Sequence, residues 1–295
     1  MFSGFIKEKI TVSETQINLV RGGEGPPLLL LHGYPQSHVM WHRVAEELAK
    51  QFYLVIPDLR GYGDSGKPPS DENHFNYSKR ASARDQVEVM AELGHDRFMI
   101  AGHDRGGRVA HRMAIDYGDK VQKLCVLDIV PTYRVFADTE KELATKYWHW
   151  FFLIQKSPLP ETLIGNNVEF YLRTMFGSWG NNNGFVTEQA FAEYLRCLKS
   201  PETIHTTCED YRAGASIDLD HDKADINQKI SCPLLALWGE FGAMHTMYNV
   251  LETWRERAID VDGWPVKCGH FIPEEAPDAI VDAFSKFFGE KSIVH

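Results

Sequence analysis

The stretch Phe98–Gly107, FMIAGHDRGG, contains the turn that decides the fold of this chain. Its first four residues form an apolar run typical of a buried strand, and residues 107–117 have the spacing of a helix. Between them lies Asp104, with glycine two positions before it and two positions after it. A strand, a tight turn flanked by small residues and a helix form a nucleophile elbow, which lifts the central side chain over the end of a sheet. An aspartate that merely caps the helix is the alternative interpretation.

Short apolar runs alternate with helical patterns on both sides of this elbow. The further strands that we expect are Ile6–Val12, Gln16–Val20, Pro27–Leu31, Tyr53–Pro57, Val121–Leu127, Pro233–Trp238 and Trp264–Lys267. Helical patterns cover His38–Lys50, Tyr77–Leu93 and Pro273–Phe288. Regular alternation of this kind predicts an α/β protein, with a mostly parallel sheet and helices on both of its faces.

The alternation stops between Pro131 and about Lys229, where the sequence is helical in pattern and rich in aromatic residues. We therefore expect a core domain formed by residues 1–130 and 230–295. Residues 131–229 are expected to form a helical cap, inserted after the strand that ends at Asp128.

Composition narrows the range of partners and compartments. The formal charge of −10 disfavours nucleic acid and anionic membranes as partners. The N-terminus has no apolar targeting region, and no segment approaches the length of a membrane span. Five scattered cysteines without metal-ligand spacing predict buried thiols in a reducing compartment and no metal site. We expect a cytoplasmic protein.

Ligands of open α/β sheets bind beyond the carboxyl ends of the strands, and several polar side chains are expected there. They are His32, Asp104, Asp128, Glu240 and His270. The order of nucleophile, acid and histidine along the chain is that of α/β hydrolases. Either Asp128 or Glu240 could be the acid, since related hydrolases place it after either of two strands.

An aspartate nucleophile selects a chemistry different from that of serine. Its carboxylate attacks an sp³ carbon and forms an alkyl ester on the enzyme. Water activated by His270 then attacks the carboxyl carbon of Asp104, so that the oxyanion develops on the enzyme's own side chain. The donors expected to stabilise it are the backbone N–H groups of Tyr34 and Arg105. Pro35 has no N–H and can only shape the turn.

Two arginines follow the nucleophile on one face of the predicted helix. Arg105 is adjacent to Asp104, and Arg108 lies three positions further along. Guanidinium groups bind carboxylates through two parallel hydrogen bonds, so this pair predicts a small carboxylate substrate. The alternative for Arg108 is a solvated helix residue.

Several motifs resemble those of one enzyme family. They are GHDRGGR at 102–108, VLDIVPTY at 126–133, YWHWFF at 147–152, EDYRAG at 209–214 and CGHF at 268–271. Together they resemble haloacetate dehalogenases of the fluoroacetate type. With HGYP at 32–35, the resemblance to α/β hydrolases covers nearly the whole chain. It implies an α/β-hydrolase fold, with a mostly parallel eight-stranded sheet and an inserted helical cap. The match of VLDIVPTY at 126–133 favours Asp128 over Glu240.

The resemblance also implies a role for each matching residue. Asp104, Asp128 and His270 are then the catalytic nucleophile, acid and base, and Arg105 and Arg108 hold the substrate's carboxylate. His149, Trp150 and Tyr211 are then the halide-binding residues. Their N–H and O–H groups could replace the hydration of a departing fluoride as the bond to carbon lengthens. Periodicity alone would assign His149 and Trp150 to the packing of a cap helix, and packing is also the expected role of Trp179.

The activity implied is the hydrolysis of a haloacetate to glycolate and halide, without a metal or an organic cofactor. Members of this family are often dimers, so a homodimer is compatible with the resemblance. An epoxide hydrolase with the same nucleophile is the first alternative, and it would use Tyr147 and Tyr211 to protonate the opening ring. A non-catalytic carboxylate receptor is the second, and the presence of Asp104, Asp128 and His270 argues against it.

Overall fold

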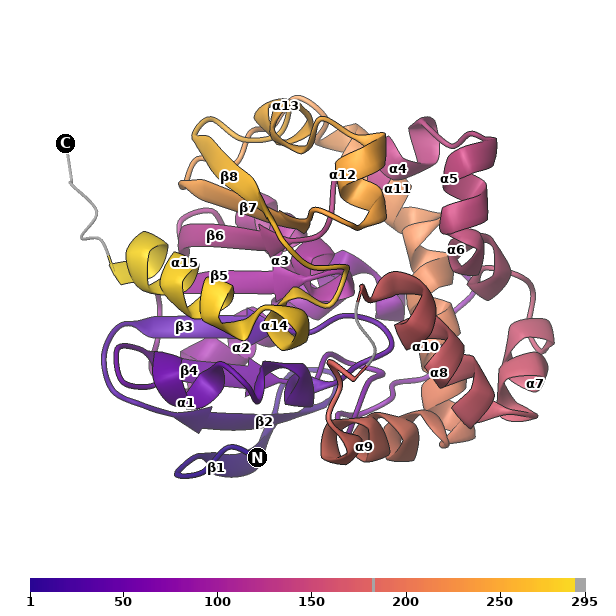
Figure 1. Ribbon diagram of the computed structural model, residues 1–295, viewed down its shortest axis with the longest axis horizontal. Coiled ribbons are helices and arrows are strands. Elements are labelled where there is room, and N and C mark those ends of the chain that lie inside the picture. Colours follow the sequence, from indigo (N-terminus) through magenta and orange to yellow (C-terminus); the bar gives the residue numbers. More distant parts are fainter. Residues whose placement is uncertain (182–183, 290–295) are drawn as a thin grey trace.

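The computed structural model describes residues 1–181 and 184–289, and its centre is a sheet with the strand order β1-β2-β4-β3-β5-β6-β7-β8 (Figure 1). The strands are β1 (Ile6–Thr11), β2 (Gln16–Gly22), β3 (Pro27–Leu31), β4 (Tyr53–Pro57), β5 (Phe98–His103), β6 (Val121–Leu127), β7 (Leu234–Gly239) and β8 (Val261–Val266). Neighbours from β4 to β8 are parallel, whereas β2 pairs antiparallel with both β1 and β4. This topology confirms the predicted mostly parallel, eight-stranded α/β sheet.

The central strands are apolar along their length because helices cover both faces of the sheet. Every residue of β5 and of β7 is buried, as is typical of parallel strands that are covered on both sides. On one face α2 (Lys79–Glu92) packs against α3 (Arg105–Asp116), and on the other α1 (Ala45–Leu48) packs against α15 (Pro277–Gly289) (Figure 1). The sheet therefore presents only its edges and its strand ends for binding.

Two predicted helices are shorter than the sequence pattern suggested. The region 38–50 holds a 3₁₀ turn, η1 (His38–Trp41), followed by the single-turn helix α1. The closing helix is divided into α14 (Ile272–Glu275) and α15, with Ala276 outside both. Pro277 explains this break, because proline disfavours helical geometry in the residue before it and lacks a backbone N–H.

Between β6 and β7, where the strand pattern stops, the described residues form eight helices. They are α4 (Thr132–Ala137), α5 (Lys141–Lys146), α6 (Trp148–Leu153), α7 (Leu159–Gly165), α8 (Val168–Trp179), α9 (Glu188–Leu198), α10 (Pro201–Gly214) and α11 (Ile217–Ala224). Figure 1 shows this insertion gathered at one end of the sheet. Nowhere in residues 1–181 and 184–289 is a helix both long and apolar enough to cross a membrane.

Candidate active site

The elbow at Asp104 has the strained backbone that the sequence predicts. Asp104 has φ 45° and ψ −116°, a conformation that residues with a side chain rarely adopt. A Cβ on Gly106 would lie 2.3 Å from the carbonyl oxygen of His32, and one on Gly102 would lie 2.5 Å from that of Gly106. Only glycine fits at these two positions, so the flanking residues allow β5, the turn and α3 to pack closely.

The carboxylate of Asp104 is buried yet ionised. Burial raises the pKa of Asp104, but the nearby charges of His270, His103, Arg108 and Arg105 outweigh it and bring the pKa to about 2. The backbone N–H of Tyr34 donates to Asp104 Oδ2 at 3.0 Å, as expected for one oxyanion donor. Within the described residues the backbone N–H of Arg105 makes no hydrogen bond to this carboxylate, although it lies at the first residue of α3. An anionic carboxylate therefore lies at the tip of the elbow.

His270 is paired with Asp128. The distance between His270 Nδ1 and Asp128 Oδ2 is 2.6 Å, and the N–H of Gly239 donates to the other carboxylate oxygen at 2.9 Å. Burial lowers the pKa of His270, but the hydrogen bond and charge of Asp128, together with the charge of Asp104, raise it overall. The side chain of Glu240 forms no hydrogen bond or ion pair with any residue that the structure describes. The geometry thus favours Asp128 as the partner of the histidine.

A cavity of about 420 Å³ connects these groups with the helical insertion. Its lining comes from both parts of the chain: Asp104, Asp128, Thr145, Lys146, Tyr147, Trp148, His149, Ser178, Trp179, Phe241, Gly242, Ala243, Thr246 and His270. Asp104, Asp128 and His270 thus share one cavity with Trp148 and His149 of α6. The cavity is of a size suited to a small molecule.

The two arginines after the nucleophile are buried and have different partners. Arg105 donates from Nε to Asp210 Oδ2 and from Nη2 to the carbonyl oxygen of Asp210, each at 2.6 Å. Arg108 donates only from Nη1, to the Val130 carbonyl at 2.9 Å and the Thr132 hydroxyl at 3.1 Å. Arg108 Nε and Nη2 are buried, with no partner among the residues that the structure describes. The alternative for Arg108, a solvated helix residue, is therefore wrong.

The three predicted halide-binding side chains lie together and have unpaired polar atoms. His149 Nδ1, Trp150 Nε1 and the Tyr211 hydroxyl are all buried, and none has a hydrogen-bond partner within residues 1–181 and 184–289. The Tyr211 ring centroid lies 5.8 Å from that of His149 and 6.0 Å from that of Trp150. The guanidinium of Arg105 stacks over Tyr211 at 4.1 Å, and that of Arg108 over Trp150 at 4.6 Å. Because unpaired buried donors are costly, this concentration of them indicates a polar ligand.

The protonation state of His149 determines whether it can bind an anion as a cation or only as a neutral hydrogen-bond donor. Burial is the main reason why the pKa of His149 falls to about 3, so its ring is neutral at ordinary pH. A neutral imidazole carries one N–H, which can be on Nδ1 in one of its two tautomers. His149 can therefore donate to an anion without carrying a positive charge of its own.

Trp179, for which packing is the expected role and the lining of an access route the alternative, forms part of the cavity wall. Its ring centroid lies 4.3 Å from that of His149 and 5.6 Å from that of His270. Its carbonyl oxygen also accepts a hydrogen bond from the backbone N–H of His270 at 2.9 Å. Trp179 thus fixes the loop of the base, through a backbone contact for which the sequence carries no signal.

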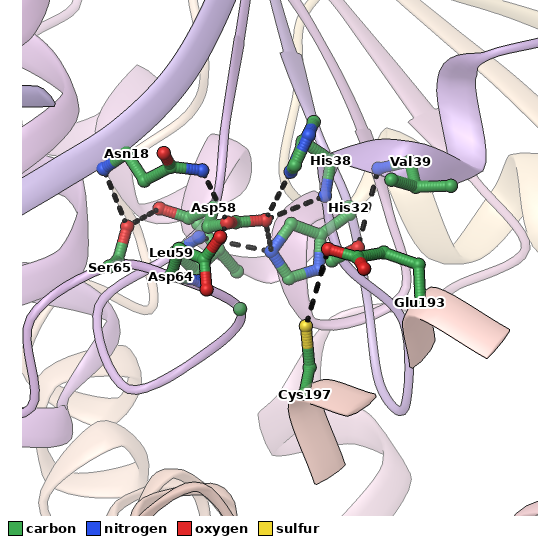
Figure 2. Close-up of polar contacts among 12 residues, drawn as sticks. Asn18, His32, His38, Val39, Asp58, Leu59, Asp64, Ser65, Glu193 and Cys197 are labelled. Atoms are coloured by element: carbon green, nitrogen blue, oxygen red, sulfur yellow. Dashed lines mark hydrogen bonds and ion pairs between the residues drawn. The ribbon is translucent and has the colours of Figure 1, made fainter. Parts of the chain in front are cut away.

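A buried polar cluster around Asp58 lies beside the turn that carries Tyr34, and Figure 2 shows its contacts. Asp58 Oδ1 accepts from the backbone N–H of His38 at 2.8 Å and lies 2.8 Å from its Nδ1. Asp58 Oδ2 accepts from Asn18 Nδ2 at 2.8 Å and from the backbone N–H of Asp64 at 2.9 Å. The cluster therefore joins β2, the end of β4 and η1.

The segment that follows β4 also fixes His32, which lies just before Tyr34. The backbone N–H of Leu59 donates to His32 Nε2 at 3.0 Å (Figure 2). Residues 32 and 38 are thus both fixed by the Asp58–Leu59 segment, with Tyr34 between them. A Cβ on Gly33 would lie only 2.5 Å from the Cβ of Asp104, so the turn is pressed against the nucleophile. Asp58 was not among the residues predicted to belong to the site.

Comparison with known proteins agrees with this geometry. Residues 26–277 match the family model of the alpha/beta hydrolase fold. The chain is 44% identical over 299 residues to fluoroacetate dehalogenase of Burkholderia sp., covering 100% of this chain and 98% of the relative. It is 36% identical to the soluble epoxide hydrolase of Corynebacterium sp. strain C12, covering 92% of this chain and 93% of that one.

A solved structure is also very similar. The alpha/beta hydrolase ALR0039 of Nostoc sp PCC 7120 superposes with a TM-score of 0.98 at 56% identity, covering 99% of this chain and 100% of that one. The elbow, the parallel sheet and the full-length matches lead to one conclusion: the chain belongs to the alpha/beta hydrolase family, and its relatives include a fluoroacetate dehalogenase and epoxide hydrolases.

Proposed function

We propose that this hydrolase removes halide from short 2-haloacids such as fluoroacetate and chloroacetate, giving glycolate. The observation that supports this most strongly is the set of buried, unpaired donors near an ionised nucleophile. Arg108 Nε and Nη2 suit a carboxylate, while His149, Trp150 and Tyr211 suit a halide. A 2-haloacid is a small molecule that carries both groups on adjacent carbons.

In the first step a carboxylate oxygen of Asp104 attacks the carbon that bears the halogen. A C–O bond forms, the carbon–halogen bond breaks, and the halide leaves with the bonding electron pair. The arginines hold the substrate's carboxylate and so orient the carbon for attack. The donors of His149, Trp150 and Tyr211 stabilise the charge that develops on the halogen, which is strongest in the transition state.

In the second step His270 accepts a proton from water, which attacks the carboxyl carbon of the Asp104 ester. Negative charge develops on an oxygen of Asp104, near the N–H of Tyr34 that lies 3.0 Å from Oδ2 in the resting enzyme. Asp128 stabilises the imidazolium through its hydrogen bond to Nδ1. The intermediate then collapses, and glycolate leaves with the proton from His270. The carboxylic acid left on Asp104 releases the second proton of the water to solvent, which restores the carboxylate.

The electrostatics of the site suit this order of events. The negative charge of Asp104 is one of the causes that raise the pKa of His270. Formation of the ester removes that charge, so the pKa of His270 falls when a neutral base is needed. The first step therefore prepares the base for the second.

An epoxide hydrolase is the second candidate, because the site also holds tyrosines. Tyr147 lines the cavity, and the hydroxyl of Tyr211 is unpaired. Incubation of the purified protein with fluoroacetate, chloroacetate and styrene oxide separates the two activities. We expect release of halide and glycolate from the haloacids. Diol formed from styrene oxide, with no halide released from either haloacid, would reject the dehalogenase in favour of the epoxide hydrolase.

A further inference from the structure

Asp210 is a buried carboxylate that contacts one of the two arginines but neither the nucleophile nor the base. It lies on α10, one residue before Tyr211, and is 5% exposed. Its Oδ2 accepts from Arg105 Nε at 2.6 Å and from the Tyr62 hydroxyl at 2.9 Å. Its Oδ1 accepts from Lys79 Nζ. All of these partners lie outside α10, so Asp210 joins the helical insertion to the core at the arginine.

These bonds leave Arg105 with little freedom. Two of its three nitrogens, Nε and Nη2, are bonded to Asp210, and the central carbon of its guanidinium lies 4.1 Å from the centre of the Tyr211 ring. Only Nη1 has no bond within the described residues, so Arg105 can offer one nitrogen to a ligand. Arg108 differs, because its Nε and Nη2 are both unpaired and no carboxylate forms an ion pair with it in the described part of the chain.

Charge balance gives Asp210 a second effect. Arg105 and Lys79 are two buried cations, and Asp210 and Asp218 are the two buried anions that pair with them. Without the charge of Asp210, this cluster would carry excess positive charge, and Arg105 would keep only its bond to the backbone carbonyl of Asp210. A buried charge that loses its partner destabilises the fold, and its side chain shifts towards another group of opposite charge. Asp104 is another anion that Arg105 influences, since the charge of Arg105 already helps to lower the pKa of Asp104.

We propose that Asp210 is a positioning residue, which holds the Arg105 guanidinium so that Nη1 completes a carboxylate site whose main donors are Arg108 Nε and Nη2. The proposal rests on the proposed function for its ligand, a small monocarboxylate, but not on the release of halide. In this arrangement Arg105 and Arg108 are not equivalent. One guanidinium is fixed by the protein, and the other is free to pair with the substrate.

The test measures binding of acetate, which needs no turnover, to the full-length protein by calorimetry. We expect Asp210→Asn to weaken acetate binding about ten- to a hundredfold, the range for a lost hydrogen bond to a charged group. Asp218→Asn is the matched control, since Asp218 is equally buried and pairs with Lys79 but contacts neither arginine. We expect its acetate affinity to stay within about twofold of the parent.

A double-mutant cycle distinguishes positioning from a general structural effect. If Asp210 acts through Arg105, Asp210→Asn should have no further effect on acetate affinity in an Arg105→Gln background. In an Arg108→Gln background it should retain its full effect. Unchanged affinity in Asp210→Asn, or a full loss that persists in Arg105→Gln, would overturn the proposal.

Two further measurements keep the result interpretable. If Asp210→Asn does not fold, Asp210→Glu keeps the buried charge but moves the carboxylate, and the same loss of affinity and the same cycle are expected. Halide release is measured separately on the parent protein. A parent that binds acetate in the predicted manner but releases no halide refutes the proposed reaction and leaves the role of Asp210 intact. If the parent releases halide but Asp210→Asn leaves the acetate affinity unchanged, the role of Asp210 is refuted and the proposed reaction stands.

Discussion

His270 Nδ1 lies 2.6 Å from Asp128 Oδ2, although the two residues are 142 positions apart in the sequence. This contact fixes which ring nitrogen faces the acid, so Nε2 is the nitrogen left to accept a proton from water. Replacement of Asp128 by Asn should lower kcat about a thousandfold or more, because the ring loses both its orientation and its charge stabilisation. Steady-state rates of halide release measure this loss.

Glu240 provides the control for that prediction. It follows the neighbouring strand, β7, but its side chain has no bond to any described residue, so Glu240→Gln should keep kcat within about twofold. Equal losses in the two variants would contradict the assignment of the acid.

Replacement of His270 by Asn should separate the two chemical steps. Displacement needs only the carboxylate of Asp104, whereas hydrolysis of the ester needs the base. We therefore expect one equivalent of halide to be released and the ester to accumulate on Asp104. Mass spectrometry of the intact protein and of its peptides measures the adduct. An unmodified Asp104 after exposure to chloroacetate would exclude the covalent route, and an Asp104→Asn variant treated in the same way is the blank.

The pH dependence of ester hydrolysis should follow the neutral form of His270. Its pKa is raised in the resting enzyme, so the histidine is protonated at low pH and becomes a base as the pH rises. Because the ester lacks the charge of Asp104, hydrolysis should reach its half-maximal rate at a lower pH than the titration of His270 in the resting protein. NMR titration and single-turnover decay of the ester give the two values. Decay that is independent of pH from about pH 5 to about pH 9 would refute His270 as the base.

Titration of Asp104 should not add a second inflection to the pH–rate profile between about pH 5 and about pH 7. The pKa of Asp104 is about 2, so this carboxylate is ionised throughout. Single-turnover halide release at saturating substrate should therefore not fall between about pH 5 and about pH 7 through protonation of Asp104. A loss of the burst with an apparent pKa in that interval would show that the nucleophile is less acidic than its surroundings imply.

Much of this site could be predicted from the sequence because its parts are short and local. The elbow at Asp104 depends on glycines within two residues of it, and Asp128 and His270 each follow a predicted strand. Asp58 and Asp210 could not be predicted in the same way. Each acts through partners that are distant in the sequence, such as Asn18 for Asp58 and Arg105 for Asp210. An isolated aspartate has the same local pattern whether it is solvated or buried with partners of this kind.

Replacement of Trp150 by Phe should affect fluoroacetate more than chloroacetate. The change removes the indole N–H, which is buried and unpaired, and keeps most of the ring that packs under Arg108. Fluoride is the smaller and more strongly hydrated anion, so its departure depends more on each donor. We expect kcat for fluoroacetate to fall about ten- to a hundredfold. The ratio of the two substrates' kcat values is the measurement, and a ratio unchanged from the parent would show that Trp150 only packs.

Replacement of Asp58 by Asn should slow ester hydrolysis while leaving displacement nearly intact. Asp58 fixes the backbone of His38, and its neighbour Leu59 fixes His32, so the position of the Tyr34 N–H between them depends on this strand end. That N–H is needed most when charge develops on Asp104 in the second step, and misplacing one oxyanion donor costs about a hundredfold. Rapid-quench measurement of the halide burst and of the later steady state separates the two steps.

Asp64→Asn is the control, because its carboxylate pairs at the surface with Lys7 and Arg196 and only its backbone contacts Asp58. We expect a normal burst with a slow steady state in Asp58→Asn and parent-like kinetics in Asp64→Asn. A burst and a steady state that slow by the same factor would instead mean that Asp58 only stabilises the fold.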